Sequence, residues 1–296
     1  MNHMISTSAR KSSGRRFVLA GLGTAALGMM ALGMMAPDAQ ALKITMKRAV
    51  FEGPNRTQTL TIINNSAEDQ TYRLGWRTMR MTENQSLVPV DDPAQATDLK
   101  PVDDMVRYAP RRITIPAGGT QQVRLLLRKP KDLVEGEYRS HFWIQPEAES
   151  VKFDPLPPEK AEEAKTKPMV QIKMLTGMTI PVIVRHGKLT VTGSITDMKA
   201  SPAKDGKGMN VGFTLNREGN RSLYGDLTFS CGGTAVKQVK GIAVYTEIGK
   251  RFLNFSVPYP ESGASACPSL KVEYVADQDD FDLKGQVIST AEASVQ

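Results

Sequence analysis

The stretch VQIKMLTGMTIPVIV, residues 170–184, is the clearest indication of the fold of this chain. In an extended strand successive side chains point to opposite faces, and here seven of the eight even-numbered positions are apolar. We therefore predict a strand over 170–184 with one almost wholly apolar face. The residues of this row that we single out are Val170, Ile172, Met174, Met178, Ile180 and Val182.

The length of this stretch and its proline both indicate an unusual strand. Most strands run about 5–6 residues, whereas this one would reach roughly 50 Å at about 3.3 Å per residue. Pro181 has no N–H to donate to a ladder, which favours an edge over a central position. Apolar edges aggregate unless they are covered or used. The pattern thus predicts an edge strand that binds another strand.

The rest of the chain is also typical of strands. Alternating segments at 57–63, 72–76 and 112–115 are bounded by turn signals such as Pro116-Ala117-Gly118-Gly119. Further strands are predicted at 122–127, 138–145, 189–195, 209–215, 226–230, 241–245, 252–257 and 270–274. This rhythm indicates an all-β protein of β-sandwich type. About 255 residues after the N-terminal segment suffice for two such domains.

Two segments depart from this rhythm. Residues 146–168, PEAESVKFDPLPPEKAEEAKTKP, hold few large apolar side chains, so we expect a mobile loop just before the long strand. Within it, 159–166 has the composition of a short helix with little to hold it. Residues 276–296 are polar, and we expect them to be a frayed tail.

The N-terminus has the form of an export signal. Arg10, Lys11, Arg15 and Arg16 precede an uncharged apolar run at 17–35, and Ala39-Gln40-Ala41 is a small-x-small cleavage pattern. We predict a signal peptide over 1–41. The alternative is an uncleaved membrane anchor, because nineteen apolar residues can span a bilayer. The sequence RRFVL also suggests twin-arginine export.

Charge and composition exclude some function classes. The chain carries 38 basic and 31 acidic residues, and removal of 1–41 lowers the net charge from +7 to +4. This mild excess does not indicate nucleic-acid binding. The remaining histidines, His141 and His186, stand in no metal or triad spacing. We therefore predict no enzyme, no cofactor and no metal site.

Cys231 and Cys267 are the two cysteines of the chain. In an exported protein such a pair favours one disulfide, and two buried free thiols are the alternative.

Four stretches carry a resemblance to a known family. They are KRAVFEGPNRTQTLTIINN at 47–65, YAPRRITIPAGGTQQVRLLL at 108–127, LVEGEYRSHFWIQ at 133–145, and the long strand after the Pro-rich loop. In this order they resemble the first domain of PapD-like periplasmic pilus chaperones. The resemblance covers 42 to about 187, and beyond that it rests on the β pattern alone.

The resemblance implies two immunoglobulin-like β-sandwich domains in a boomerang arrangement, over 42–186 and 187–296. It also implies a periplasmic chaperone that binds pilus (fimbrial) subunits and delivers them to an outer-membrane usher. The long strand would complete the subunit's sandwich by donor-strand complementation, a form of β-strand addition. Two alternatives stay open: a secreted structural or adhesive protein whose long strand pairs with a copy of itself, and an exported metal-binding protein.

The family also holds the carboxylate at the subunit's C-terminus with an arginine and a lysine. Arg48 matches the arginine, and an exposed strand-end charge is the alternative for it. The lysine does not carry over, because its position holds Pro181. Lys173 or Arg185, both nearby in the sequence, would take its place.

Overall fold

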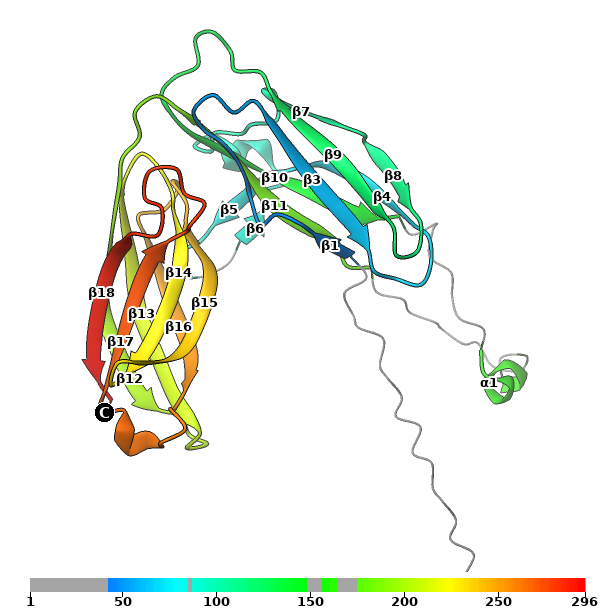
Figure 1. The fold of residues 1–296 in the computed structure, drawn as a ribbon. Coiled ribbons are helices and arrows are strands. Elements are labelled where there is room, and N and C mark those ends of the chain that lie inside the picture. The colour runs from blue at the N-terminus through cyan, green and yellow to red at the C-terminus, as the bar shows by residue number, and fades with distance from the viewer. Residues whose placement is uncertain (1–41, 85–86, 148–155, 164, 166–174, 296) are drawn as a thin grey trace, which may run out of the picture. The chain divides into compact units, whose positions relative to one another are not determined.

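The computed structural model describes residues 42–84, 87–147, 156–163, 165 and 175–295. The predicted signal peptide, 1–41, lies outside these residues, as do Val170, Ile172 and Met174. The described chain is nearly all β (Figure 1), which confirms the predicted class. An α-helix, α1 (Pro158–Glu163), lies within the predicted loop 146–168, near the segment expected to be helical. None of the described helices is long and apolar enough to cross a membrane.

The first sandwich joins a four-stranded sheet, in the order β1-β3-β9-β7, to a five-stranded sheet, in the order β2-β11-β10-β4-β8. The bounds are β1 Leu42–Ile44, β2 Ala49–Phe51, β3 Thr57–Asn64, β4 Gln70–Arg77, β7 Val106–Ala109, β8 Arg112–Ile115, β9 Thr120–Leu127, β10 Gly136–Pro146 and β11 Met178–His186. A separate hairpin pairs β5 (Met79–Met81) with β6 (Leu87–Pro89).

The second sandwich joins a three-stranded sheet, in the order β12-β13-β16, to a four-stranded sheet, in the order β15-β14-β17-β18. The bounds are β12 Val191–Pro202, β13 Gly208–Gly219, β14 Leu223–Cys231, β15 Thr234–Val244, β16 Lys250–Pro258, β17 Ser269–Ala276 and β18 Val287–Ser294.

Each sandwich has its own apolar core between its two sheets. In the first core, alternate residues of β3 such as Leu60 and Ile62 are buried together with Phe142 of β10. The rings of Trp76 and Tyr108 meet Phe142 edge to face, with centroids 5.3 and 4.9 Å from it. A strand places every second side chain on the same face, so segments with alternating apolar residues can bury one face in the core as strands.

The long strand is shorter in the structure than the sequence predicts. Residues 175–177 are not in a strand, and β11 begins at Met178. On one side it pairs along its whole length with β10, and on the other side β2 pairs only with Val182–Val184. Among the described residues, Met178–Pro181 thus form an unpaired edge as predicted, whereas the prediction is wrong for Val182–Val184, which β2 covers.

The predicted frayed tail is wrong. Residues 287–294 form β18, which pairs with β17 from Ser269↔Ser294 to Val275↔Val287. Ile288 and Ala291 pack against the second core, so the strand has apolar contacts as well as a ladder of backbone bonds. The polar composition of VISTAEAS concealed this, because an edge strand with one solvated face needs few apolar residues.

The structure contains the predicted disulfide between Cys231 and Cys267, which are 36 residues apart. Both cysteines are almost fully buried in the second core.

We expect the Cys231→Ser/Cys267→Ser double variant to be less stable by about 4 kcal/mol, because the bond removes loop-closure entropy from the unfolded chain. Urea unfolding under oxidising conditions measures this difference. Reduced wild-type protein is the control and should match the variant. A variant as stable as the oxidised wild type would show that the bond does not stabilise the fold.

Candidate functional site

The free edge of β11 ends beside an arginine. In the parallel register Ala49 lies opposite Val182, Val50 opposite Ile183 and Phe51 opposite Val184. Arg48 directly precedes β2, so the register places it level with Pro181. Among the described residues, no strand pairs with Met178–Pro181 on that side. The site therefore combines an unpaired stretch of backbone with a cation at its C-terminal end.

The side chains of β11 are mostly enclosed by the protein itself. Ile180 and Val182 are 2% and 0% exposed and belong to the first core. On the opposite face Ile183 packs with Met81 and Tyr245 in a smaller apolar cluster. Within the described part of the predicted row, Met178 is the residue that keeps partial exposure. Val170, Ile172 and Met174 lie outside the described residues, so their role stays a prediction.

Arg48 is buried but incompletely paired. Its side chain is 7% exposed, and its guanidinium carbon lies 3.9 Å from the centre of the Tyr224 ring. Its Nη2 is 3.5 Å from Asp277 Oδ1. Its Nη1 is buried and has no hydrogen-bond partner among the described residues. A buried donor in this state typically costs about 1–3 kcal/mol, so the site favours a ligand with an acceptor oxygen.

Arg185 lies nearby at the end of β11. Its Nε donates to Glu137 Oε2 at 3.0 Å and its Nη1 to Glu52 Oε2 at 2.9 Å. Burial acts to lower the pKa of Arg185, but Glu137 and Glu52 beside it raise the pKa overall. Its Nη2, like Arg48 Nη1, is buried without a partner. A second guanidinium donor thus lacks an acceptor in the same region.

Both arginines line a single cavity of about 400 Å³. Its lining also includes the apolar side chains of Met46, Val50 and Phe281. Three acids line it: Glu52 accepts from Arg185, Asp277 pairs with Arg48, and Asp279 is exposed. Carboxylates bind guanidinium groups through charge-assisted hydrogen bonds, so a carboxylate is the ligand that this cavity fits best.

Sequence reasoning missed several buried ionic contacts, one of which involves Arg185 of the site. Glu137 of β10 accepts from Arg185 and also from the backbone N–H of Ser222, at 3.2 Å. A further buried pair joins Arg139 of β10 to Glu247, which also accepts from the N–H of Met81. The partners are far apart in the chain, and no local pattern in the sequence indicates them.

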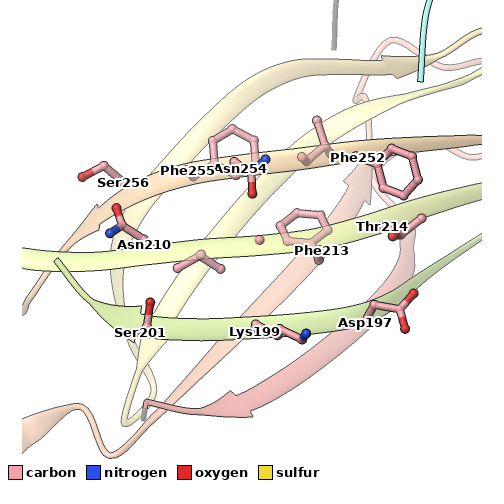
Figure 2. A pocket seen from close by; sticks show the side chains of 13 residues that line it. Asp197, Lys199, Ser201, Asn210, Phe213, Thr214, Phe252, Asn254, Phe255 and Ser256 are labelled. Carbon is pink, nitrogen blue, oxygen red and sulfur yellow. The ribbon is translucent and has the colours of Figure 1, made fainter. Parts of the chain in front are cut away.

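Another cavity, of about 830 Å³, lies on the outer face of the sheet β12-β13-β16. Figure 2 shows the side chains of Asp197, Lys199, Asn210 and Asn254 along this open face. Among its described lining residues, no side-chain atom is both buried and unpartnered. It therefore lacks the unsatisfied group that distinguishes the cavity at Arg48.

Side chains that could bind a metal ion are not grouped in the described residues. There, no group of three or more His, Cys, Asp or Glu side chains is placed to hold a metal ion. His141, one of the two histidines considered above, is 1% exposed and lies opposite Pro181 in the sheet. Burial, together with the neighbouring Arg139, lowers its pKa to about 3. His141 is thus a neutral, buried side chain on β10, the strand that pairs with β11.

The comparisons with known proteins concern the fold. No family model matches the sequence, and no curated protein matches it either. Solved structures of pilus chaperones do match. The class 5 fimbriae chaperone CfaA is 12% identical with a TM-score of 0.41, over 86% of this chain and 99% of that chain.

Two further structures match to a similar degree. The Pseudomonas aeruginosa CupB2 chaperone is 12% identical with a TM-score of 0.40, over 86% of this chain and 100% of that chain. A Salmonella enterica structure of the SafA pilin in complex with the SafB chaperone gives 10% identity and a TM-score of 0.39, over 86% and 96%. At these identities the likeness concerns the fold alone.

The buried His141 predicts a pH dependence of stability. The unfolded chain takes up a proton near pH 6.5, whereas the folded protein does so only near pH 3. Between these values the unfolded state binds more protons, so His141 lowers stability by up to about 1.4 kcal/mol per pH unit as the pH falls. Urea unfolding between pH 6.5 and 4 should show a shallower decline for His141→Gln than for wild type. Identical slopes would contradict a neutral buried His141, and His186→Gln is the control.

Proposed function

We propose that this protein is a non-enzymatic periplasmic chaperone. In this proposal it binds pilus (fimbrial) subunits by donor-strand complementation and passes them to an outer-membrane usher. The observation that supports it best is the free edge Met178–Pro181, which ends level with the buried, unsatisfied Arg48. A strand edge alone fits many partners. A strand edge that leads to a carboxylate site fits the end of a polypeptide chain.

The position of the cation sets the direction of the bound strand. Arg48 lies at the C-terminal end of the free edge. A client strand with its terminal carboxylate at Arg48 therefore runs parallel to β11. Its backbone pairs with Met178–Pro181, and its upstream part extends toward residues 170–177. Strand addition of this kind draws affinity from backbone hydrogen bonds and specificity from alternate side chains.

The side chains that enter the client come from the upstream part of the predicted row. Ile180 and Val182 already fill the first core. In this proposal Val170, Ile172, Met174 and Met178 fill the gap that the missing strand leaves in the client. Burial of each such side chain stabilises the complex by roughly 1.5–3 kcal/mol before association and ordering costs are subtracted.

The carboxylate anchor consists of Arg48, with Arg185 in place of the family's lysine. Hydrogen bonds to charged groups contribute about 1.5–3 kcal/mol each. The acceptor would relieve Arg48 Nη1, which is unsatisfied in the free protein. A carboxylate that accepts two hydrogen bonds is held in one orientation, which also fixes the register of the client strand. The anchor thus determines which client residues meet which pockets.

Charges in the upstream row should abolish client binding. We expect an Ile172→Asp/Met174→Asp variant, co-expressed with the fibre subunit encoded beside it, to lose the one-to-one periplasmic complex on copurification. A charged side chain in an apolar pocket of the client would be unpaired. The control carries Val134→Asp and Val287→Asp at exposed positions. An undiminished complex would contradict the proposal, and a stable self-assembled dimer or fibre of the free protein would favour the structural alternative.

Loss of the anchor should weaken capture without unfolding the protein. For Arg48→Ala we expect an affinity for the subunit about 10-fold to 100-fold lower, which corresponds to 1.5–3 kcal/mol. The exposed Arg124→Ala is the matched control. Binding is measured on purified complexes, and thermal unfolding is measured on the free proteins. A lower melting temperature with unchanged affinity would show that Arg48 is structural.

A further inference from the structure

The cavity of about 830 Å³ in the second sandwich is lined by residues in three rows, each of which crosses the strands β12, β13 and β16. The strand register defines these rows as Ser201–Asn210–Ser256, Lys199–Gly212–Asn254 and Thr196–Thr214–Phe252. Figure 2 shows Asn210 near one end of the cavity and Phe252 near the other. Its volume lies within the range of about 300–1,000 Å³ that is typical of ligand pockets.

Gly212 forms the floor of the cavity in the middle row. It lies within β13, the central strand of the sheet, where a glycine weakens a strand because it has no side chain to pack. A Cβ added to Gly212 would lie 2.7 Å from Asn254 Oδ1. The glycine therefore lets the amide of Asn254 lie over the floor of the cavity.

A β-bulge on β12 shapes the side of the cavity. Two residues, Asp197 and Met198, stand between Thr196 and Lys199, where β13 has one residue. Met198 packs against the second core, whereas Asp197 is exposed and lines the cavity. Asp197 has a φ of +56° and is the one non-glycine residue of the described chain with a positive φ. Thr196 Oγ1 donates to Asp197 Oδ2 at 3.0 Å, so this carboxylate is held beside the cavity.

These two features distinguish the cavity from an ordinary solvated sheet face. The outer faces of antiparallel sheets are commonly polar, and polarity alone would indicate only contact with water. A glycine inside a strand and a positive φ at a non-glycine residue both destabilise a fold. Here Gly212 and Asp197 shape the same hollow, and strained backbone of this kind is concentrated at functional sites.

The lining offers hydrogen-bond donors and acceptors but carries no net charge. The side chains of Asn210, Asn254 and Ser201 make no hydrogen bond to other described residues, and each can both donate and accept. Asp197 and Lys199 are the charged residues of the lining, and their charges cancel. At one end the ring of Phe252, which is 37% exposed, adds an aromatic surface.

A sugar matches this combination of groups. Its hydroxyl groups donate and accept hydrogen bonds, and a neutral sugar needs no charged partner. One face of a pyranose ring consists of C–H groups, which pack against the negative face of an aromatic ring. Several β folds bind oligosaccharides on the surface of a sheet or barrel.

We propose that this cavity binds a neutral oligosaccharide. One pyranose ring packs on Phe252, and the amides of Asn254 and Asn210 bond to the hydroxyl or acetamido groups of the units that follow along the hollow. Asp197 and Lys199 bond to the same chain from β12. This binding goes beyond the proposed chaperone function and does not depend on it.

The test titrates chitotetraose, a neutral oligosaccharide, into the isotope-labelled full chain and follows the backbone amide resonances by NMR, which measures weak binding. We expect shifts in β12, β13 and β16. Asn254→Ala and Phe252→Ala should each weaken binding by about fivefold to tenfold, because they remove an amide and an aromatic surface. Gly212→Ala should also weaken it, since its Cβ would displace the amide of Asn254.

Two control variants are matched to these changes. Asn65→Ala removes an exposed amide outside the cavity, and Leu87→Ala removes an apolar side chain with an exposure of 38%, close to that of Phe252. Both should bind chitotetraose as wild type does. The melting temperature of each variant shows whether it is folded, and the exposed Asn254→Ala provides the test if Gly212→Ala does not fold.

Three results would overturn the inference. The first is the lack of any shift with chitotetraose at millimolar concentration, or shifts confined to the first sandwich. The second is equal affinity of wild type, Asn254→Ala and Phe252→Ala. The third is tighter binding of tetragalacturonate, an anionic oligosaccharide, because a lining without net charge should not favour an anion.

Discussion

The structure around the site depends on one buried cation. Arg185, at the end of β11, donates to Glu137 of β10 and to Glu52, which follows β2, and it lies 3.7 Å from Asp280 of the loop after β17. A buried charge is tolerated only when it is paired and hydrogen-bonded. These four residues come from four separate parts of the chain, so their pairing fixes those parts with respect to one another.

This constraint explains where β2 lies. Glu52 can reach Arg185 only if the segment before it runs beside the last residues of β11, and β2 accordingly pairs with Val182–Val184. The same placement brings Arg48 level with Pro181, and no strand of the described chain pairs with Met178–Pro181 on that side. Pro181 itself has no N–H, so the open edge ends at a residue that cannot donate to a ladder. The site is therefore a consequence of the way in which the buried cation is paired.

The second sandwich contributes to the site through the same network. Asp280 pairs with Arg221 as well as approaching Arg185. Burial acts to raise the pKa of Asp280, and the bonds from Arg221 and from backbone amides hold it below its ordinary value. The charged carboxylate keeps the loop 277–283 in place, and with it Asp277 and Phe281 beside Arg48. Stability of the fold and the shape of the cavity thus rest on the same ions.

The sequence by itself determined the elements whose signal is local. Period-two alternation in segments such as 57–63 and 112–115 predicted β3 and β8 closely, and the cysteine pair predicted the disulfide. Three-residue strands such as β1 and β2 went unpredicted, because such short segments show no measurable period. The polar β18 was mistaken for a tail for a related reason. Only the tertiary structure decided which part of β11 stays unpaired and that Arg48 ends beside it, because these depend on buried charge pairs 48 and 133 residues apart in the chain.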